Sequence, residues 1–310
     1  MKKIPLGKTD LQTPPIIFGG NVFGWTLDKT DSFKLLDRLL EKGFNFIDTA
    51  DSYSHWAPGN SGGESETIIG NWMKDRGVRE QVTIATKVGS NPGKEGRDVS
   101  KKYILEAAED SLRRLKTDSI DLYFTHWDNE NTPVEETLEA YEQLLKQGKI
   151  RNIGASNLSP SRIRASMKAA DEGLPRYKVL QPEYNLVERE KFEKDYLPLV
   201  EEYNFGVTPY FSLASGFLTG KYRKEEDLKG DRKEMVKKYF NEKGLKILKI
   251  QDEIAREHGV SNAAVALAWL MKKPGITAPI ASATKESHLK AFEEAVDLEL
   301  SQEEMERFEF

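Results

Sequence analysis

The sequence contains no cysteine, so disulfide bonds, thiolate metal ligands and cysteine nucleophiles are all excluded. It contains four histidines, which show no metal-ligand spacing: His55, His126, His258 and His288. The longest apolar run, residues 263–271, is too short to cross a bilayer, and the first ten residues lack the apolar run of a signal peptide. We therefore expect a cytoplasmic protein that has no metal and does not enter a membrane.

Basic stripes and aromatic–basic repeats are also missing, and the formal net charge is −5 with charges of both signs mixed along the chain. This balance argues against a nucleic-acid partner. No GxGxxG follows any expected strand, and residues 216–221 (GFLTGK) are one spacing short of a phosphate-binding P-loop. The two common nucleotide-binding loops are therefore not expected.

What the 310 residues do contain is a regular alternation of apolar strand-like runs and helix-like periodic segments. Eight repeats of a strand and a helix predict a parallel sheet, and most simply a closed (β/α)8 TIM barrel, with an open doubly wound sheet as the alternative. We expect strands at 16–19, 44–48, 82–87, 120–126, 150–156, 179–184, 206–210 and 276–281, and helices at 31–43, 65–75, 101–115, 134–148, 160–173, 194–204, 245–259 and 287–296.

The barrel is expected to carry an N-terminal β-hairpin around residues 7–10 and a C-terminal helical extension. Residues 222–243 are charged and irregular, and we interpret them as an insertion that acts as a lid. No change of composition marks a second domain, so residues 1–310 are expected to form a single domain.

Polar side chains stand where several apolar strands end. Asp48 ends one strand, Lys87 ends the next, and His126 follows the third. Chemistry in such barrels lies at the carboxyl ends of the strands, so these side chains are expected to meet. Each has a structural explanation when taken alone, as a cap, a solvent-facing amine or a core histidine, but their meeting at one rim favours a catalytic site.

An aspartate and a lysine on neighbouring strands predict a buried ion pair, in which each charge removes the cost of burying the other. Breaking such a pair costs about 3–5 kcal/mol. Tyr53, five residues beyond Asp48, is placed to reach the Lys87 ammonium. A nearby cation lowers the pKa of a phenol, so we expect a lowered pKa for Tyr53 and a role as proton donor.

Seven stretches of the chain resemble the aldo-keto reductase family, in order and over nearly the whole length. They are LGKTDLQTPPIIFGG (6–20), FIDTADSY (46–53), IATK (84–87), DLYFTHW (121–127), GKIRNIGASN (148–157), LQPEYN (180–185) and PYFSLASGFLTGKY (209–222). The chain looks most similar to the branch near the aryl-alcohol dehydrogenases and the potassium-channel β subunits.

The resemblance implies a barrel that binds NADP(H) and a catalytic tetrad of Asp48, Tyr53, Lys87 and His126. In this reading Tyr53 protonates the carbonyl oxygen, Lys87 held by Asp48 tunes Tyr53, and His126 orients the carbonyl. Matched positions imply a cofactor site of Ser156, Asn157, Gln181, Tyr210, Phe211, Ser212, Leu213, Ser215, Gly216, Leu218, Lys221, Ser282, Ala283, Thr284, Lys285 and His288.

The chain departs from the family pattern at Phe211–Ser212, where Ser-Pro is common, and at Ser282, His288 and Phe292 in the stretch that meets the adenosine. The usual arginine is missing there, and Lys285 or Thr284 is left to meet a 2′-phosphate. We expect NADPH rather than NADH.

The substrate pocket is expected to be built from four aromatic residues, Phe23, Trp25, Trp56 and Trp127. Aromatic walls suit aryl or apolar carbonyl compounds, and sugar-derived carbonyls are a further candidate. The alternative is that these aromatic residues only pack the surface.

The sequence thus predicts an NADPH-dependent reductase of small aldehydes and ketones that is a monomer or a weak homo-oligomer. The first alternative is an NADP(H)-binding regulatory or sensor subunit with little turnover, which a turnover assay separates from an enzyme. The second is a lyase that forms a Schiff base on Lys87, which borohydride trapping would reveal. Asp48 beside Lys87 disfavours the lyase because it keeps the amine protonated.

Overall fold

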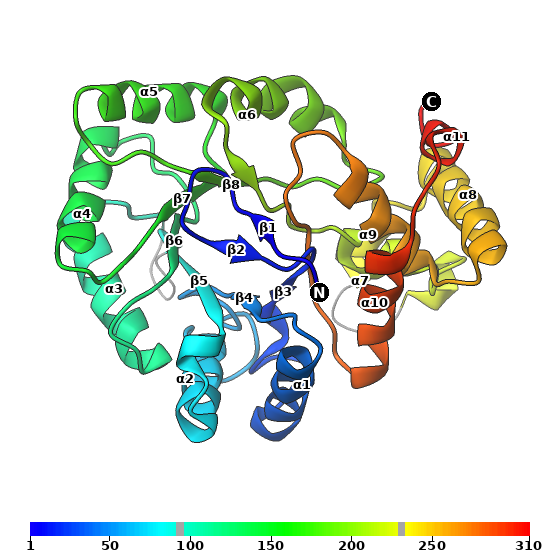
Figure 1. Cartoon of the computed structure of the whole chain (residues 1–310), viewed down its shortest axis with the longest axis horizontal. Coiled ribbons are helices and arrows are strands. Elements are labelled where there is room, and N and C mark those ends of the chain that lie inside the picture. The colour runs from blue at the N-terminus through cyan, green and yellow to red at the C-terminus, as the bar shows by residue number, and fades with distance from the viewer. Residues whose placement is uncertain (91–95, 229–232) are drawn as a thin grey trace.

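A computed structural model of the chain describes residues 1–90, 96–228 and 233–310 (Figure 1). Its centre is an eight-stranded parallel sheet with the strand order β10-β3-β4-β5-β6-β7-β8-β9. The strands are β3 (Ile17–Gly19), β4 (Phe46–Asp48), β5 (Thr83–Val88), β6 (Leu122–Thr125), β7 (Ile153–Ser156), β8 (Val179–Gln181), β9 (Gly206–Val207) and β10 (Ile280–Ala281).

Backbone hydrogen bonds join the two ends of this sheet. The N–H groups of Thr277 and Ala278 donate to the Val207 carbonyl at 2.9 and 3.2 Å, and the Ile280 N–H donates to the Pro209 carbonyl at 2.9 Å. The sheet therefore curls into a ring, and the predicted (β/α)8 barrel is confirmed.

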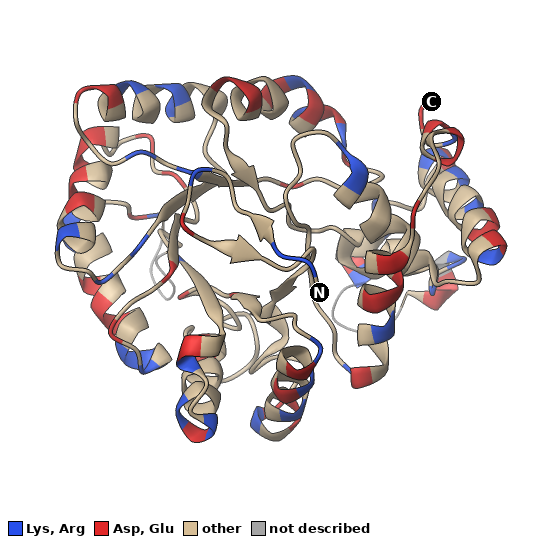
Figure 2. Cartoon of the chain, in the orientation of Figure 1, with Lys and Arg blue, Asp and Glu red and all other residues tan. Residues whose placement is uncertain are grey.

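Helices surround the strands as an outer ring (Figure 1). They are α1 (Lys29–Glu41), α2 (Glu64–Arg76), α3 (Lys101–Leu115), α4 (Val134–Lys146), α5 (Pro160–Asp171), α6 (Leu197–Tyr203), α8 (Glu242–His258) and α10 (Lys290–Asp297). In α3 the buried residues recur every three or four positions, and the Ser100 side chain caps the first turn by accepting from the Tyr103 N–H. Charged residues lie mainly on the outer helices and loops, whereas the barrel strands are largely uncharged (Figure 2).

The predicted N-terminal hairpin is formed by β1 (Ile4–Pro5) and β2 (Gln12–Thr13) and lies across the barrel in Figure 1. Its buried Leu6 and Leu11 belong to a core cluster that also contains barrel residues such as Phe46 and Leu122. Gly7 lies so close to β9 that a Cβ there would be 2.3 Å from the Gly206 nitrogen. The hairpin therefore covers the amino-terminal end of the barrel, and chemistry is left to the opposite end.

Two helices were not expected from periodicity, α7 (Lys233–Lys237) and α9 (Asn262–Lys272), whereas α11 (Gln302–Glu306) is the predicted C-terminal helical extension. The apolar run 263–271 lies in α9, which is buried all round over residues 263–270 and so has no amphipathic period to read. No helix among the described residues is both long and apolar enough to cross a membrane.

The charged segment 222–243 contains a short 3-10 turn at Glu225–Asp227, then α7 and the start of α8. Residues 229–232 lie outside the described part of the chain. Met235, on α7, lines the large cavity introduced below. The role of this segment as a lid stays a prediction.

Candidate active site

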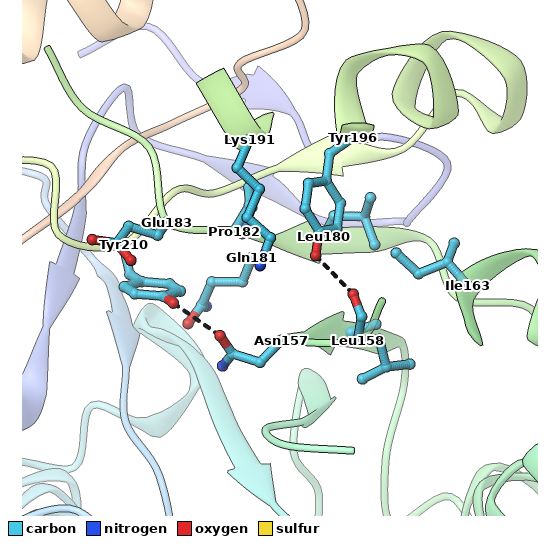
Figure 3. A pocket seen from close by; sticks show the side chains of 11 residues that line it. Asn157, Leu158, Ile163, Leu180, Gln181, Pro182, Glu183, Lys191, Tyr196 and Tyr210 are labelled. Atoms are coloured by element: carbon cyan, nitrogen blue, oxygen red, sulfur yellow. Dashed lines mark hydrogen bonds between the residues drawn. The ribbon is translucent and has the colours of Figure 1, made fainter. Parts of the chain in front are cut away.

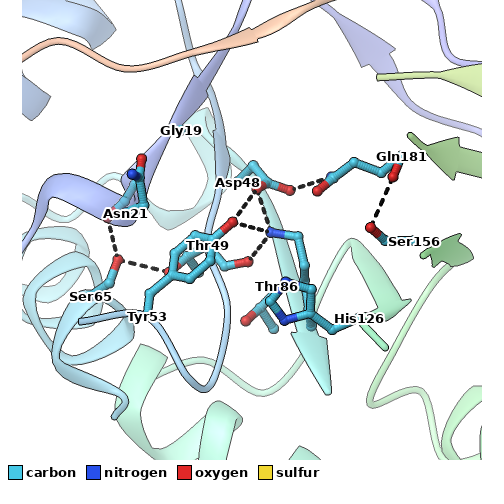
Figure 4. A network of polar contacts seen from close by, with 12 residues as sticks. Gly19, Asn21, Asp48, Thr49, Tyr53, Ser65, Thr86, His126, Ser156 and Gln181 are labelled. Atoms are coloured by element: carbon cyan, nitrogen blue, oxygen red, sulfur yellow. Dashed lines mark hydrogen bonds and ion pairs between the residues drawn. The ribbon is translucent and has the colours of Figure 1, made fainter. Parts of the chain in front are cut away.

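The ends of β4 and β5 bring an aspartate, a lysine and a tyrosine into direct contact, and Figure 4 shows Asp48 and Tyr53 within this network. The Lys87 ammonium donates to Asp48 Oδ1 at 2.5 Å, to the Thr49 carbonyl at 2.7 Å and to the Tyr53 hydroxyl at 2.9 Å. The three N–H donors of the ammonium therefore all have acceptors. This satisfied geometry is what allows a lysine to lie 0% exposed beside an aspartate that is 2% exposed.

The surroundings of Lys87 hold its charge. Burial alone would lower the pKa of the amine, but Asp48 and the Tyr53 hydroxyl outweigh burial and raise the pKa above its ordinary value. A protonated amine has no lone pair for attack on a carbonyl. The arrangement therefore disfavours the Schiff-base alternative.

Tyr53 differs from the sequence prediction in the net direction of its pKa. Burial raises the pKa of the phenol, and the Lys87 charge offsets this only in part, so the pKa stays above its ordinary value. The expected lowering was wrong because desolvation of the phenolate is the larger effect. Tyr53 accordingly carries its proton at neutral pH, as a proton donor must.

His126 follows β6, and its ring centre lies 6.0 Å from that of Tyr53. Burial, together with the charges of Lys87 and Arg97, lowers the pKa of His126 well below its ordinary value, so the imidazole is neutral. Its Nδ1 lies 3.0 Å from the Ser90 hydroxyl. When Ser90 donates to Nδ1, the imidazole proton is on Nε2, where it is available to a carbonyl oxygen. Ser90 was not identified from the sequence.

Gln181, at the end of β8, has a different contact from the one implied by the family resemblance. Its amide Nε2 donates to Asp48 Oδ2 at 2.9 Å, and its backbone carbonyl accepts from the Ser156 hydroxyl at 2.9 Å. Both oxygens of Asp48 are therefore hydrogen-bonded, one to Lys87 and one to Gln181. Gln181 supports the ion pair from the far side of the barrel mouth.

Tyr210 and Asn157 form a second group at the mouth (Figure 3). The Tyr210 hydroxyl donates to Asn157 Oδ1 at 2.8 Å, and the Asn157 amide donates to the His126 carbonyl at 2.9 Å. A small cavity of about 50 Å³ lies beside them, where the Tyr196 hydroxyl donates to the Leu158 carbonyl. These bonds fix the Tyr210 ring next to the residues that carry the tetrad.

A large cavity of about 1490 Å³ opens from the tetrad. Asp48, Tyr53 and His126 line one part of it with Trp25, Trp56 and Trp127. Most of the residues predicted to bind a cofactor line it too: Ser156, Asn157, Gln181, Tyr210, Phe211, Ser212, Leu213, Ser215, Gly216, Lys221, Ser282, Thr284, Lys285 and His288. Residues from both ends of the chain thus share one cavity.

Three of the residues predicted to bind cofactor or substrate do not line this cavity. Phe23 is 0% exposed and stacks on Phe18 in the core with ring centres 5.5 Å apart, so it is not a pocket wall. Leu218 and Ala283 are also buried in the core, at 0% and 1% exposure. Apolar side chains next to polar, cavity-lining neighbours turn inward because burial is worth more to them.

The loop 211–216, most of which lines the cavity, has an unusual backbone. Phe211, Ala214 and Ser215 have φ of 54°, 47° and 56°, the left-handed region that side chains other than glycine rarely adopt, and Gly216 has φ of 99°. Clusters of such residues occur at ligand-binding sites, where the surrounding structure maintains the strain. Since this loop faces the cavity, its conformation suits a binding role.

Several cavity residues were missed from the sequence, among them Asn21, Glu183, Tyr222, Met235 and Lys290. Asn21 follows β3 and its Oδ1 accepts from the Ser282 hydroxyl at 2.6 Å, so the strand-end argument applied to the first strand would have found it. Met235 and Tyr222 lie in the irregular segment and give no such signal.

Asp51 is a second buried acid near the tetrad, 4% exposed, and its Oδ1 has no hydrogen-bond partner among the described residues. Burial, and next the charge of Glu66, raise the pKa of Asp51 to about 8. Glu66 itself accepts from the Arg114 guanidinium at 2.6 Å and from the Thr86 hydroxyl at 2.5 Å. Arg114 is thus engaged by Glu66, and Asp51 is the neutral member of the pair at pH 7.

The family model described as "Aldo/keto reductase family" matches residues 15–309. The chain is 33% identical over 304 residues to the "Probable voltage-gated potassium channel subunit beta" of Arabidopsis thaliana, with 94% of this chain and 90% of that protein covered.

Two further relatives have enzyme names. The chain is 34% identical to "Aldo-keto reductase YhdN" of Bacillus subtilis over 294 residues, which cover 92% of this chain and 84% of that protein. It is 31% identical to "Putative aryl-alcohol dehydrogenase AAD14" of Saccharomyces cerevisiae over 327 aligned positions, which cover 98% of this chain and 85% of that protein. These similarities extend over the elements that build the cavity.

Proposed function

The chain belongs to the aldo/keto reductase family, and from this premise we propose that it is an NADPH-dependent oxidoreductase that reduces aldehydes and ketones to alcohols. The observation that carries the proposal is the buried chain Asp48–Lys87–Tyr53, which meets the half-buried, neutral His126 at the wall of a large cavity. The proposal treats residues 1–310 as one barrel domain that acts in the cytoplasm, as a monomer or a weak oligomer.

The residues around the cavity suit a dinucleotide. Ser156 and Asn157 place a hydroxyl and an amide in the cavity wall near the tetrad, and most of the strained loop 211–216 lines the cavity too. Lys221 and Lys285 line the cavity without an ion pair among the described residues, and His288 lies with them. Two ammonium groups that lack an ion pair in the described structure favour the extra phosphate of NADPH over the hydroxyl of NADH. When bound, the reduced nicotinamide supplies the hydride for the carbonyl carbon.

The protein's own residues handle the proton. Tyr53 holds a proton at neutral pH and donates it from its hydroxyl to the carbonyl oxygen as negative charge develops there. The Lys87 ammonium, 2.9 Å from that hydroxyl, stabilises the tyrosinate left behind. Asp48 and Gln181 keep the ammonium in place, and His126 donates a second hydrogen bond to the oxygen. Trp25, Trp56 and Trp127 provide apolar walls that suit aryl carbonyl compounds.

The relatives named as potassium channel β subunits favour a second candidate, a cofactor-binding regulatory subunit with little turnover. The two functions share the cofactor and differ in whether the tetrad is used. A turnover assay on the purified protein decides between them.

The experiment follows NADPH absorbance with and without an activated aryl aldehyde such as 4-nitrobenzaldehyde, alongside NADPH binding by fluorescence. We expect binding and aldehyde-dependent oxidation that yields the alcohol in equal amount. Binding with no oxidation across a panel of aryl, aliphatic and sugar-derived aldehydes would favour the regulatory subunit. Failure to bind NADPH would reject both.

A further inference from the structure

Trp127 carries a charged neighbour that the proposed chemistry does not use. The Trp127 ring lines the cavity, and its centre lies 5.8 Å from the ring centre of His126. The guanidinium carbon of Arg97 lies 4.2 Å from the Trp127 ring centre, a distance typical of a cation–π contact. The guanidinium is therefore no more than about 10 Å from the imidazole. This distance is about the Debye screening length at 0.1 M salt, so the two groups can interact electrostatically.

Arg97 is held at both its backbone and its side chain although it is exposed. The Asn129 amide donates to the Arg97 carbonyl at 2.7 Å, and Trp127 holds the guanidinium. Both anchors belong to the loop that follows β6 and carries His126. A long side chain fixed in this way loses less conformational entropy on binding a ligand than a free one.

The described acids next in sequence to Arg97 and to Trp127, which are Asp98 and Asp128, are engaged elsewhere. Asp98 accepts from the Ser100 N–H at 2.9 Å, and both oxygens of Asp128 bind the Arg162 guanidinium, at 2.7 and 2.9 Å. Arg97 forms no ion pair with any residue that the structure describes. The field of its charge reaches His126, where it contributes to the lowered pKa of the imidazole.

We propose that Arg97 binds the anionic end of the substrate, so that the preferred substrates are aryl aldehydes bearing a carboxylate away from the carbonyl. This rests on the proposed reductase function. A guanidinium pairs with the two oxygens of a carboxylate through parallel hydrogen bonds, and one guanidinium matches one negative charge. The Trp127 ring lines the cavity and contacts both the His126 ring and the exposed Arg97 guanidinium, so it suits the apolar ring of a ligand whose carboxylate extends to Arg97. Arg97 is then a specificity residue, since the proton and hydride steps proceed without it.

The test compares two aldehydes that differ in charge, 4-carboxybenzaldehyde and its methyl ester, in the wild type and in Arg97→Gln. We expect kcat/KM for the acid to fall about tenfold in the variant, mainly through KM, while kcat/KM for the ester stays within about twofold. Added salt should raise KM for the acid only. Arg113→Gln, which removes an exposed arginine paired with Asp110 on α3, is the matched control and should leave both substrates unchanged.

An equal fall for acid and ester would mean that Arg97 acts only by supporting Trp127, and would overturn the proposal. An unchanged kcat/KM for the acid in Arg97→Gln would overturn the proposal too. Calorimetric binding of 4-(hydroxymethyl)benzoate separates this failure from failure of the proposed function, because it needs no turnover. If the wild type reduces neither aldehyde but still binds 4-(hydroxymethyl)benzoate, while Arg97→Gln does not bind it, the carboxylate site stands and the reductase function fails. If the wild type does not bind 4-(hydroxymethyl)benzoate, the carboxylate site is overturned.

Discussion

Asp48 and Asp51 lie three residues apart and are both buried, but only Asp48 has a cation in hydrogen-bond contact. The Lys87 ammonium and the Gln181 amide take both oxygens of Asp48, whereas Asp51 faces the charge of Glu66 and has an oxygen without a partner in the described structure. One carboxyl is thus built into an ion pair, and the other keeps its proton. A buried acid without a partner is held neutral rather than charged.

This difference predicts how stability depends on pH. The pKa of Asp51 is raised to about 8 in the folded protein, above its unfolded value, so the unfolded chain releases this proton first and stability falls as pH rises from about 4 to 8. Asp51→Asn removes that titration. We expect the free energy of unfolding of the variant, measured with urea relative to wild type, to gain about 2 kcal/mol or more between pH 5 and pH 8.

Asp118→Asn, at an exposed acid, is the control and should show the same difference from wild type at both pH values. An Asp51→Asn effect that does not change with pH would show that Asp51 is ionised in the folded protein. The account of the acid pair would then be wrong.

Among single residues, the sequence predicts the polar side chains that end strands, because the alternation of apolar and polar residues shows where strands end. Asp48, Lys87 and His126 were identified in this way, and Tyr53 by its place five residues beyond Asp48. Asp51 and Ser90 were not, because their roles depend on what neighbouring elements bury or donate. The net direction of the Tyr53 pKa was also missed, since burial cannot be weighed against charge without the fold.

The first turn of α2 holds the strand ends that carry the tetrad. Ser65 bonds Thr49 and the Gly20 carbonyl, and Glu66 bonds Thr86, the residue before Lys87. Arg114 of α3 completes the contact by donating to Glu66. The helix therefore fixes β4 and β5 from outside while their opposite faces hold the site.

Close packing of α2 on α3 depends on Gly70. A Cβ there would be 2.2 Å from the Arg114 carbonyl oxygen, which is backbone and cannot move alone. Gly70→Ala should destabilise the protein by about 1–3 kcal/mol through overpacking, although alanine is the better helix former. Thermal and urea unfolding measure this, with Lys74→Ala on the exposed side of α2 expected within about 0.5 kcal/mol of wild type. A Gly70→Ala protein as stable as wild type would mean that the two helices are not in backbone contact.

Elements with an amphipathic period were well predicted, and others were not. The expected helix at 101–115 matches α3 in both bounds because its period, cap and last basic turn agree. Helix α9 has no polar face and was read only as an apolar run. The last two strands are shorter than predicted, two residues each, because the chain leaves the ladder soon after it contributes its barrel hydrogen bonds.

At the scale of the whole molecule, the hairpin covers one end of the barrel and the cavity lies at the other. Lys221 and Lys285, which form no ion pair with any described residue, lie on part of the cavity wall. A ligand that binds only the folded state adds about 2.7 kcal/mol to the free energy of unfolding at a hundred times its Kd, and so raises the melting temperature. We expect NADPH to raise the melting temperature by several degrees and NADH by clearly less. In Lys285→Ala the two shifts should converge, whereas Lys249→Ala, on the exposed face of α8, should behave as wild type.

Equal shifts for the two cofactors in the wild type would contradict the assignment of the lysines to the extra phosphate. The barrel and the shared cavity followed from eight strand–helix repeats and from matched motifs. The sequence could not show which lysines lack an ion pair, because surface ion pairs form between segments distant in sequence, such as Lys42 with Glu293.

The central claim is that Tyr53 donates the proton in carbonyl reduction, and a single-turnover comparison of wild type with Tyr53→Phe tests it most directly. NADPH-loaded protein is mixed with the aryl aldehyde, and oxidation is followed beside a Tyr203→Phe control on the outer helix α6. We predict that Tyr53→Phe binds NADPH as wild type does and reacts at least a hundredfold more slowly, within the range of general acid catalysis, while the control is unchanged. A Tyr53→Phe protein that binds NADPH and reduces the aldehyde at the wild-type rate would contradict the account.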